Sequence, residues 1–173
     1  MKKQILVNNQ WLKVIRETVR FPDGTFMKDF YTVERPTYAA VVPLFGNGEI
    51  LLVRQYRHGP RRTILNLPMG RFAKKEKPMH AAKRELLEET GYTAKRISLL
   101  GAFENNPAFL RLTAHIFLAR NLKKKINYKT DTKERTTMIR ISLQQALNKI
   151  LRGEIEDMTT VIGILLTYFR LEK

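Results

Sequence analysis

The stretch GRFAKKEKPMHAAKRELLEETGY, residues 70–92, decides the fold of this protein. Its second half carries the signals of a helix over residues 78–90. Pro78 suits the first turn of a helix, where its missing N–H costs nothing, and Gly91 suits a C-terminal cap. An apolar stripe for the core is predicted at helical spacing, formed by Met79, Ala82 and Leu86.

Three glutamates, Glu85, Glu88 and Glu89, lie at the end of this predicted helix, although the chain has twice as many basic as acidic residues. Their i,i+3 and i,i+4 spacings place all three on one side. Like charges at this spacing destabilise a helix, and acids in its last turn oppose the helix dipole. Two interpretations follow: a solvated acidic face that balances nearby lysines, or a site for a hard divalent cation such as Mg²⁺.

The composition indicates one folded domain of ordinary size with a small appendage. The chain has 173 residues, of which 43% are hydrophobic, and no cysteine. The lack of cysteine excludes disulfides and thiolate metal sites and fits a reducing compartment. The N-terminus has no apolar run of signal-peptide length, and the longest late run, VIGILLTYF, is far short of the roughly 20 residues of a membrane span. We therefore expect a cytoplasmic protein with no membrane partner.

The formal net charge of +16 predicts attraction to polyanions, including incidental binding of nucleic acid. The positive residues are scattered, and the densest clusters are GPRRT, KKEK and LKKKINYK. None of them is interleaved with aromatic residues as in a platform for single-stranded nucleic acid. A basic surface exposed to solvent is the alternative interpretation.

Strands and helices alternate along the chain with several hairpins, which predicts an α/β or α+β fold with a mixed sheet between helices. Residues 4–34 are predicted to be β structure with a turn at PDGT, and residues 38–57 a second, buried hairpin around GNGE. Further strands are expected at residues 95–105, 113–122 and 138–142, and helices at residues 142–153 and 157–171. Ser142 is the expected N-cap and Gly153 the expected end of the first of these helices.

Residues 1–37 are expected to form a small antiparallel β unit, and residues 38–173 the main domain. A three-stranded unit of this size is too small to be stable alone. We therefore expect it to pack on the main domain or on a second subunit.

The pattern in residues 70–92 resembles the Nudix box, the signature of Nudix pyrophosphohydrolases. It reads Gly70, five residues, Glu76, seven residues, Arg84-Glu85-Leu86, one residue, Glu88-Glu89, one residue, Gly91-Tyr92, and only Tyr92 departs from the usual aliphatic residue. The similarity extends over about residues 35–168 to ADP-ribose and nucleotide-sugar pyrophosphatases. It implies an αβα sandwich, and it implies a homodimer formed through the N-terminal β unit.

The resemblance also implies roles for the residues of the box. Glu85 and Glu89 are expected to bind a divalent metal directly, Glu88 directly or through water, with the carbonyl of Met69 completing the shell. Mg²⁺ is the expected ion, with Mn²⁺ left open. Arg84 is expected to orient a glutamate, Glu76 to hold the loop, and Gly70 and Gly91 to let the backbone bend. The implied reaction is attack of a metal-activated water on a phosphorus of a diphosphate.

Three further residues are implicated in substrate binding by the same resemblance. Pro107 resembles a mark of the ADP-ribose branch, and the alternative is an ordinary turn proline. Arg57 matches a position that contacts the diphosphate, and Arg35 one near the nucleotide or its terminal ribose; both could instead be surface arginines. Asn66 replaces a frequent glutamate, and the loop PAFLRLT differs from the usual one. GDP-mannose or another nucleotide sugar therefore remains open as the substrate.

The general base is expected in the polar segment KINYKTDTKERTT, where Glu134 is closest to the family position and Asp131 lies nearby. A solvated loop glutamate is the alternative for Glu134, and Glu88 is then the base. Upstream of the helix, the side chains of Lys74, Lys75 and Lys77 are expected to draw a polyanionic substrate towards the acids.

The first hypothesis is a Mg²⁺-dependent nucleotide-sugar diphosphatase that converts ADP-ribose to AMP and ribose 5-phosphate. The second is a Nudix enzyme that acts on RNA 5′ ends, as the net charge of +16 would favour. The third is a catalytically silent nucleic-acid-binding protein with a Nudix fold, against which the intact box argues.

Overall fold

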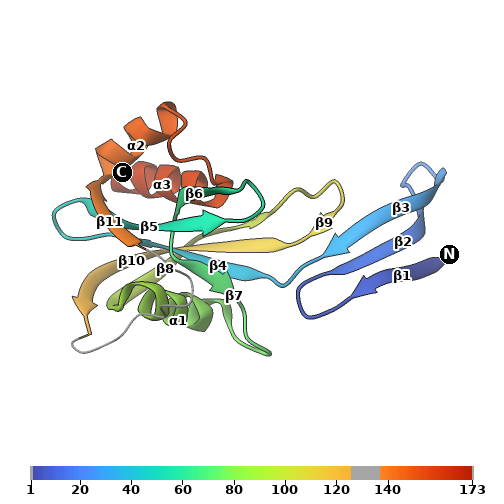
Figure 1. The fold of residues 1–173 in the computed structure, drawn as a ribbon, viewed down its shortest axis with the longest axis horizontal. Helices are drawn as coiled ribbons and strands as arrows, with labels where there is room; N and C mark the ends of the chain where they lie inside the picture. The colour runs from blue at the N-terminus through green and yellow to red at the C-terminus, as the bar shows by residue number, and fades with distance from the viewer. Residues whose placement is uncertain (1, 126–136, 173) are drawn as a thin grey trace. The chain divides into compact units, whose positions relative to one another are not determined.

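The computed structural model describes residues 2–125 and 137–172 (Figure 1). The chain divides into two compact units, one of Met1–Thr37 with Phe103–Ala114 and the other of Tyr38–Ala102 with His115–Lys173. Residues 103–114 thus belong with the N-terminal β structure. The predicted domain boundary at residue 37 stays a prediction. No helix in the described ranges is long and apolar enough to cross a membrane.

The first unit is a four-stranded sheet of β1 (Lys3–Asn8), β2 (Lys13–Arg20), β3 (Phe26–Glu34) and β9 (Leu110–Arg111), in the order β1-β2-β3-β9. The predicted turn joins β2 to β3, where Asp23 accepts hydrogen bonds from the backbone and hydroxyl of Thr25. Gly24 takes a φ of +87°, which favours glycine. The fourth strand, β9, pairs in parallel with β3 and was not expected from the sequence.

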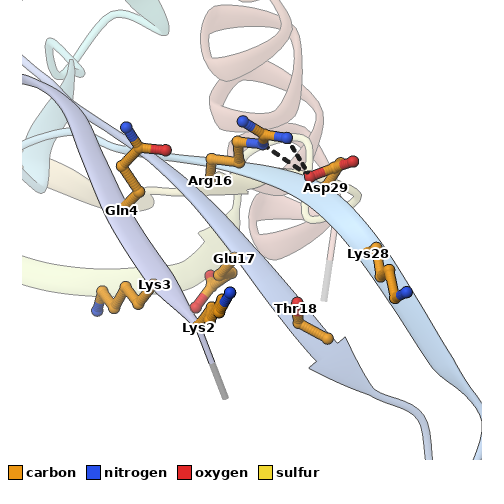
Figure 2. Close-up of a pocket in the computed structure, with 8 residues that line it drawn as sticks. All are labelled: Lys2, Lys3, Gln4, Arg16, Glu17, Thr18, Lys28 and Asp29. Atoms are coloured by element: carbon orange, nitrogen blue, oxygen red, sulfur yellow. Dashed lines mark hydrogen bonds and ion pairs between the residues drawn. The ribbon is translucent and has the colours of Figure 1, made fainter.

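A groove of about 700 Å³ on this sheet is lined by both cations and acids (Figure 2). Arg16 of β2 reaches across to Asp29 of β3, with its Nε 2.7 Å from the Asp29 carboxylate. Glu17, which also lines the groove, accepts from the hydroxyl of Thr32 at 2.9 Å. Glu17 and Asp29 therefore balance part of the positive charge that lines this groove.

The second unit contains two sheets. The first has four strands, β7 (Met69–Arg71), β4 (Tyr38–Pro43), β10 (Thr113–Lys124) and β8 (Tyr92–Glu104), in the order β7-β4-β10-β8. The second has three strands, β11 (Thr137–Ser142), β5 (Glu49–Arg57) and β6 (Arg62–Asn66), in the order β11-β5-β6.

The predicted hairpin over residues 38–57 is only partly correct. Its turn exists, with the N–H of Phe45 2.8 Å from the carbonyl of Glu49. Its two strands, β4 and β5, meet only at a bridge between Leu44 and Ile50 and then join different sheets. Local turn signals therefore located the reversal of the chain, but not the long-range partners of each strand.

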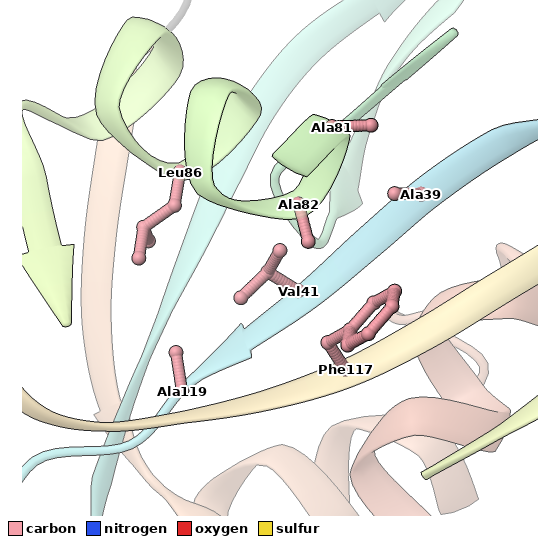
Figure 3. Packing of buried hydrophobic residues seen from close by; sticks show 7 residues of the cluster. All are labelled: Ala39, Val41, Ala81, Ala82, Leu86, Phe117 and Ala119. Atoms are coloured by element: carbon pink, nitrogen blue, oxygen red, sulfur yellow. The ribbon is translucent and has the colours of Figure 1, made fainter. Parts of the chain in front are cut away.

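Helix α1 (Pro78–Thr90) covers one face of the four-stranded sheet (Figure 3). Its alanines and Leu86 pack on alternate residues of β4 and β10. These buried side chains are Ala39, Val41, Ala81, Ala82, Leu86, Phe117 and Ala119. The predicted apolar stripe is thus wrong at Met79, which is 42% exposed and borders an open cavity, while Ala81 is buried.

The opposite face of the same sheet packs on α3 (Met158–Leu171), as Val42 and Ile116 show. At Gly163 of α3 a Cβ would lie 3.1 and 3.2 Å from these two side chains and 2.6 Å from Leu67. The helix can approach the sheet this closely only because the residue has no side chain. With α1 on one face and α3 on the other, this sheet is the centre of the predicted αβα sandwich.

The helix α2 (Leu143–Leu151) begins and ends as predicted. The Ser142 hydroxyl accepts from the N–H of Gln145 at 3.1 Å, and the Gln145 side chain accepts from the N–H of Ser142 at 2.9 Å. This reciprocal pair is a capping box. Gly153 follows the helix with a left-handed φ of +71°.

Candidate active site

The loop before α1 and the end of α1 are both held by local hydrogen bonds. In the loop, Glu76 accepts from the N–H of Ala73 at 2.8 Å, and its own N–H donates to the carbonyl of Ala73 at 3.0 Å. At the helix end, Gly91 adopts a φ of 72°, and its N–H reaches the carbonyl of Leu87 at 2.8 Å. Both conformations are set by residues that the box pattern contains.

Arg84 gathers three carboxylates around one guanidinium. Its Nε and Nη2 donate to the two oxygens of Glu76 at 3.0 and 2.9 Å, a bidentate pair. Its Nη1 donates to Glu85 at 2.5 Å and to Glu88 at 2.9 Å, and Nη2 also reaches the carbonyl of Arg71 at 2.8 Å. One cation therefore links the loop, the strand β7 and the helix face.

These contacts shift the pKa values of Arg84 and Glu76. The hydrogen bonds that Arg84 donates to Glu76 are the main reason why the pKa of Arg84 lies above its ordinary value. The same bonds lower the pKa of the Glu76 carboxyl. Arg84 and Glu76 therefore both keep their charged forms throughout the neutral pH range.

The carboxylate of Glu85 lies directly against Gly70. The Glu85 residue is 7% exposed, and a Cβ built on Gly70 would come within 2.1 Å of its carboxylate oxygen. Any side chain at position 70 would have to displace that group. The glycine of the box is thus needed for space. Its φ is not positive, so the backbone freedom expected at this position is not what requires glycine.

The residues present fit a hard divalent ion. Glu85 and Glu88 each place an oxygen within hydrogen-bond distance of the same Arg84 nitrogen, and carboxylate oxygens are the ligands that Mg²⁺ prefers. Within residues 2–125 and 137–172, no three acidic, histidine or cysteine side chains are arranged so that they could hold a metal ion together. Mg²⁺ commonly takes only one or two carboxylates and fills its shell with water and substrate phosphates, so two gathered carboxylates suffice.

The other predicted ligands lie beside this pair. Glu89 is half-buried in the last turn of α1. Met69 opens β7 and pairs with Ala40 of β4, one position before the register pair of Gly70 and Ala39. The backbone at Met69 is therefore fixed by the central sheet.

Arg57, the predicted diphosphate contact, is positioned by Asn66. The Arg57 Nε donates to the Asn66 amide oxygen at 3.1 Å, and Asn66 is only 2% exposed. From the sequence, Asn66 is only a departure from the family pattern. Its place directly before LPMG was the available signal, but its partner nine residues upstream is brought to it by the pairing of β5 with β6.

The remaining predicted residues lie in the first unit or outside the described residues. Pro107 borders a cavity of about 360 Å³ in the first unit, together with Glu104 and Arg111. Arg35 is exposed in the same unit, and its N–H donates to the carbonyl of Arg111 at 3.2 Å. Glu134 and Asp131 lie outside the described residues. The roles predicted for all four stay predictions.

A sequence model of the NUDIX domain matches residues 34–159, which include the whole loop–helix arrangement described above. The chain belongs to the Nudix family. The Nudix domain thus accounts for most of the chain, as the box predicted. The mixed α+β fold with its central sheet between helices is confirmed as well.

Similar proteins support this Nudix assignment along nearly the whole chain. An ADP-ribose pyrophosphatase of Bacillus subtilis (strain 168) is 32% identical over 94% of this chain and 88% of its own length. A methanol dehydrogenase activator of Bacillus methanolicus is 32% identical over 95% and 89%, respectively. An ADP-ribose pyrophosphatase of Mycobacterium tuberculosis is 32% identical over 87% and 73%.

Among solved structures, that of an ADP compounds hydrolase superposes on this Nudix protein with a TM-score of 0.86. The match covers 99% of this chain and 92% of the other, at 20% sequence identity. At that identity the likeness concerns the fold alone.

Proposed function

We propose that this Nudix protein is a divalent-metal-dependent enzyme that hydrolyses the diphosphate bond of a nucleoside diphosphate sugar. ADP-ribose is the proposed substrate, with AMP and ribose 5-phosphate as products. The observation that carries the proposal is the gathering of Glu85 and Glu88 by Arg84, with the Glu85 carboxylate lying against Gly70. The substrate class is supported by two relatives of similar length, both named ADP-ribose pyrophosphatase.

The metal of this proposal is Mg²⁺, with Mn²⁺ as the second choice. Glu85, Glu88, Glu89 and the carbonyl of Met69 are the groups proposed to hold it. When bound, such an ion neutralises the diphosphate and lowers the pKa of a water molecule. Glu85 is suited to this task because its carboxylate is buried and its position is restricted by Gly70 and Arg84.

Arg57 is proposed to bind the diphosphate of the substrate. Its Nε is engaged by Asn66, which leaves the two terminal nitrogens without hydrogen bonds to any described residue. A guanidinium held in this way can offer two parallel N–H groups to a phosphate. Asn66 is therefore proposed as a positioning residue for Arg57. The proton acceptor is proposed to be Glu134, with Glu88 as the alternative.

The first unit is proposed to form a homodimer interface. It exposes several large apolar side chains, most of them on β1 and β3 or next to those strands. They include Ile5, Leu6, Val7, Trp11, Phe26, Met27 and Tyr31. A small sheet that leaves such residues in water gains stability when a second copy covers them. Light scattering coupled to gel filtration should give the mass of a dimer, and Phe26→Lys with Tyr31→Lys should shift it towards the monomer.

The test of the activity is hydrolysis with Mg²⁺ across a panel of ADP-ribose, GDP-mannose, UDP-glucose, NADH, diadenosine polyphosphates and triphosphorylated RNA. Products are measured as phosphate released by a coupled phosphatase. We expect the largest kcat/KM for ADP-ribose, and a Glu89→Gln variant that is folded but nearly inactive. Turnover of RNA alone would replace this proposal by the second hypothesis, RNA 5′-end hydrolysis, which the net charge of +16 favours.

A panel without any turnover, together with tight and salt-sensitive RNA binding, would favour the silent nucleic-acid-binding protein. A matched pair of variants addresses the base. Glu134→Gln should lower kcat far more than it raises KM, whereas Asp131→Asn should change both little. A normal kcat in Glu134→Gln would assign the role to Glu88.

A further inference from the structure

A cavity of the second unit, of about 500 Å³, contains none of the box carboxylates. It is lined by the first two turns of α1, by β8 and β10, and by the last turn of α3. Five cations border it, and no acidic residue does. These are Lys83, Lys95, Arg96, Arg120 and Arg170.

None of the five cations forms an ion pair with an acid in residues 2–125 or 137–172. Other arginines of the same unit do find such partners, such as Arg84 with Glu76 and Arg140 with Glu49. Within the described residues, the side chain of Arg170 makes a single hydrogen bond, a long one of 3.3 Å from its Nη1 to the carbonyl of Leu99. The positive charge there is therefore not neutralised by the described part of the chain.

Arg120 adds an independent observation. Its Nε is shielded from solvent and has no hydrogen-bond partner in the described structure. Buried polar groups are almost always hydrogen-bonded, because a buried donor without an acceptor costs about 1–3 kcal/mol. A missing acceptor at this position points to a ligand that supplies one.

The side chains that line the cavity indicate which kind of acceptor the ligand supplies. Arginine side chains bind phosphate through paired N–H groups, and lysines add charge without a fixed direction. Three apolar residues, Met79, Ile97 and Leu118, border the same cavity, and the exposed side chain of Met79 offers an apolar surface to a sugar or a base. Its volume lies within the range of about 300–1,000 Å³ that is typical of small-molecule sites.

We propose that this cavity is a second, non-catalytic site that binds the phosphate groups of nucleotides. The nucleotide can be a free one or one unit of a nucleic-acid strand, because both present the same phosphate and sugar chemistry. The site is distinct from the proposed diphosphatase centre and does not depend on that activity. It differs from the groove on the first unit, where Glu17 and Asp29 balance part of the positive charge.

Protection of a sheet edge is the competing explanation for part of this charge. Lysine and arginine on an edge strand such as β8 discourage pairing with another chain. This purpose is served by Lys95 and Arg96 alone. It requires neither a cavity nor Arg120, whose strand β10 lies inside the sheet between β4 and β8.

The test measures binding in EDTA, so that metal-dependent binding at the catalytic centre is removed. Two probes separate the two sources of the ligand: ADP, titrated by calorimetry, and a fluorescein-labelled single-stranded RNA of about ten nucleotides, followed by anisotropy. The variant Arg96→Ala with Arg170→Ala removes two cations of the cavity. Its matched control is Lys123→Ala with Lys124→Ala, which removes the same charge from exposed residues outside the cavity.

We expect the cavity variant to raise the Kd of at least one probe about tenfold at low salt, and the control to change it less than about threefold. If RNA is the ligand, the slope of log Kd against log salt should fall by roughly 1.4, because each lost contact to a single strand contributes about 0.7. Binding of ADP without RNA would assign the site to free nucleotides, and RNA binding without ADP to a strand.

Two results would overturn the proposal: equal weakening by the cavity and control variants, or no binding of either probe to the wild type at about 50 mM salt. Melting temperatures of both variants show whether they are folded. A further variant, Arg120→Lys, keeps the charge but removes the buried Nε donor. It should weaken binding as well if Arg120 contacts the ligand, and unchanged binding of both probes would remove Arg120 from the site.

Discussion

The acidic end of α1 and the cationic cavity beside its first turns differ in how their like charges are neutralised. At the acidic end, Arg84 binds Glu76, Glu85 and Glu88 within 2.5 to 3.0 Å. In the cavity, five cations have no acidic partner in the described residues. The charges of the first cluster are neutralised within the protein, and those of the second are left to the solvent or to the proposed anion.

This difference predicts opposite effects of removing a charge. Removing one member of a compensated cluster leaves the others unpaired, which destabilises the fold. Removing one member of an uncompensated cluster relieves repulsion and removes no attraction within the protein. The predictions below test this contrast, from the largest expected effect to the smallest.

Gly70→Ala should lower kcat/KM by about 100-fold while changing stability little. The new Cβ would fall 2.1 Å from the Glu85 carboxylate, and that flexible group can move away only by leaving its place beside Arg84. A displacement of about 1 Å in a catalytic site commonly costs that factor. Hydrolysis of ADP-ribose and thermal melting are measured together.

Gly59→Ala is the matched control for this change, because a Cβ at Gly59 meets no atom within 4 Å and its φ is not positive. It should leave both quantities unchanged. A fully active Gly70→Ala variant would show that the position of the Glu85 carboxylate is not needed for the reaction.

Arg84→Met should lower the free energy of unfolding by about 2 kcal/mol in EDTA. The value is below that of a fully buried ion pair because the Arg84 side chain is 31% exposed. Added Mg²⁺ should restore part of the loss, since it neutralises Glu85 and Glu88 in place of the guanidinium. Urea unfolding with and without Mg²⁺ measures both effects, and an equal loss in the two conditions would argue against metal binding by this pair.

Glu34→Gln should lower stability by about 0.5–1 kcal/mol at pH 7, and this loss should shrink as the pH falls through the folded-state pKa of the carboxyl. Hydrogen bonds from Lys13 and Arg111 hold the pKa of the Glu34 carboxyl below its ordinary value. A lowered folded-state pKa means that the stabilisation is present above the unfolded pKa and is lost as the pH falls through the folded one. Thermal melting of wild type and variant against pH gives the difference, and a difference that does not shrink as the pH is lowered would exclude this ionic origin.

Arg96→Ala with Arg170→Ala should change the free energy of unfolding by less than about 0.5 kcal/mol, or raise it slightly. No acid loses a partner, and two repelling charges are removed. A loss as large as that of Arg84→Met would mean that the cavity cations are neutralised within the protein, and the contrast between the two clusters would disappear. Urea unfolding at low salt, where repulsion is largest, is the sensitive measurement.

Most elements of the second unit could be predicted because their signals are local. Pro78 and Gly91 delimit α1, and the Ser142 and Gln145 pair marks the start of α2 within four residues. The failures concern partners distant in sequence. They are the separation of β4 and β5 into two sheets, the short strands β6, β7 and β9, and the exposure of Met79.

The same division holds for the candidate site. The spacing of Glu85 and Glu88 on one helix follows from the helical repeat, so the sequence alone placed them together. The hydrogen bond between Arg57 and Asn66 depends on the register of β5 against β6, which the sequence of neither strand determines by itself. The need for glycine at position 70 is tertiary, because the Glu85 carboxylate of α1 lies where a Cβ of this β7 residue would be.

By itself, the sequence determined the family, the helix that carries the acids and the charge that must be neutralised there. These follow from covalent spacing and from helix geometry, which act over a few residues. The tertiary structure alone decided which charges are neutralised by the protein and which are left for a ligand. Electrostatic compensation depends on distances of a few ångströms between residues far apart in the chain, and only the folded packing of strands and helices sets those distances.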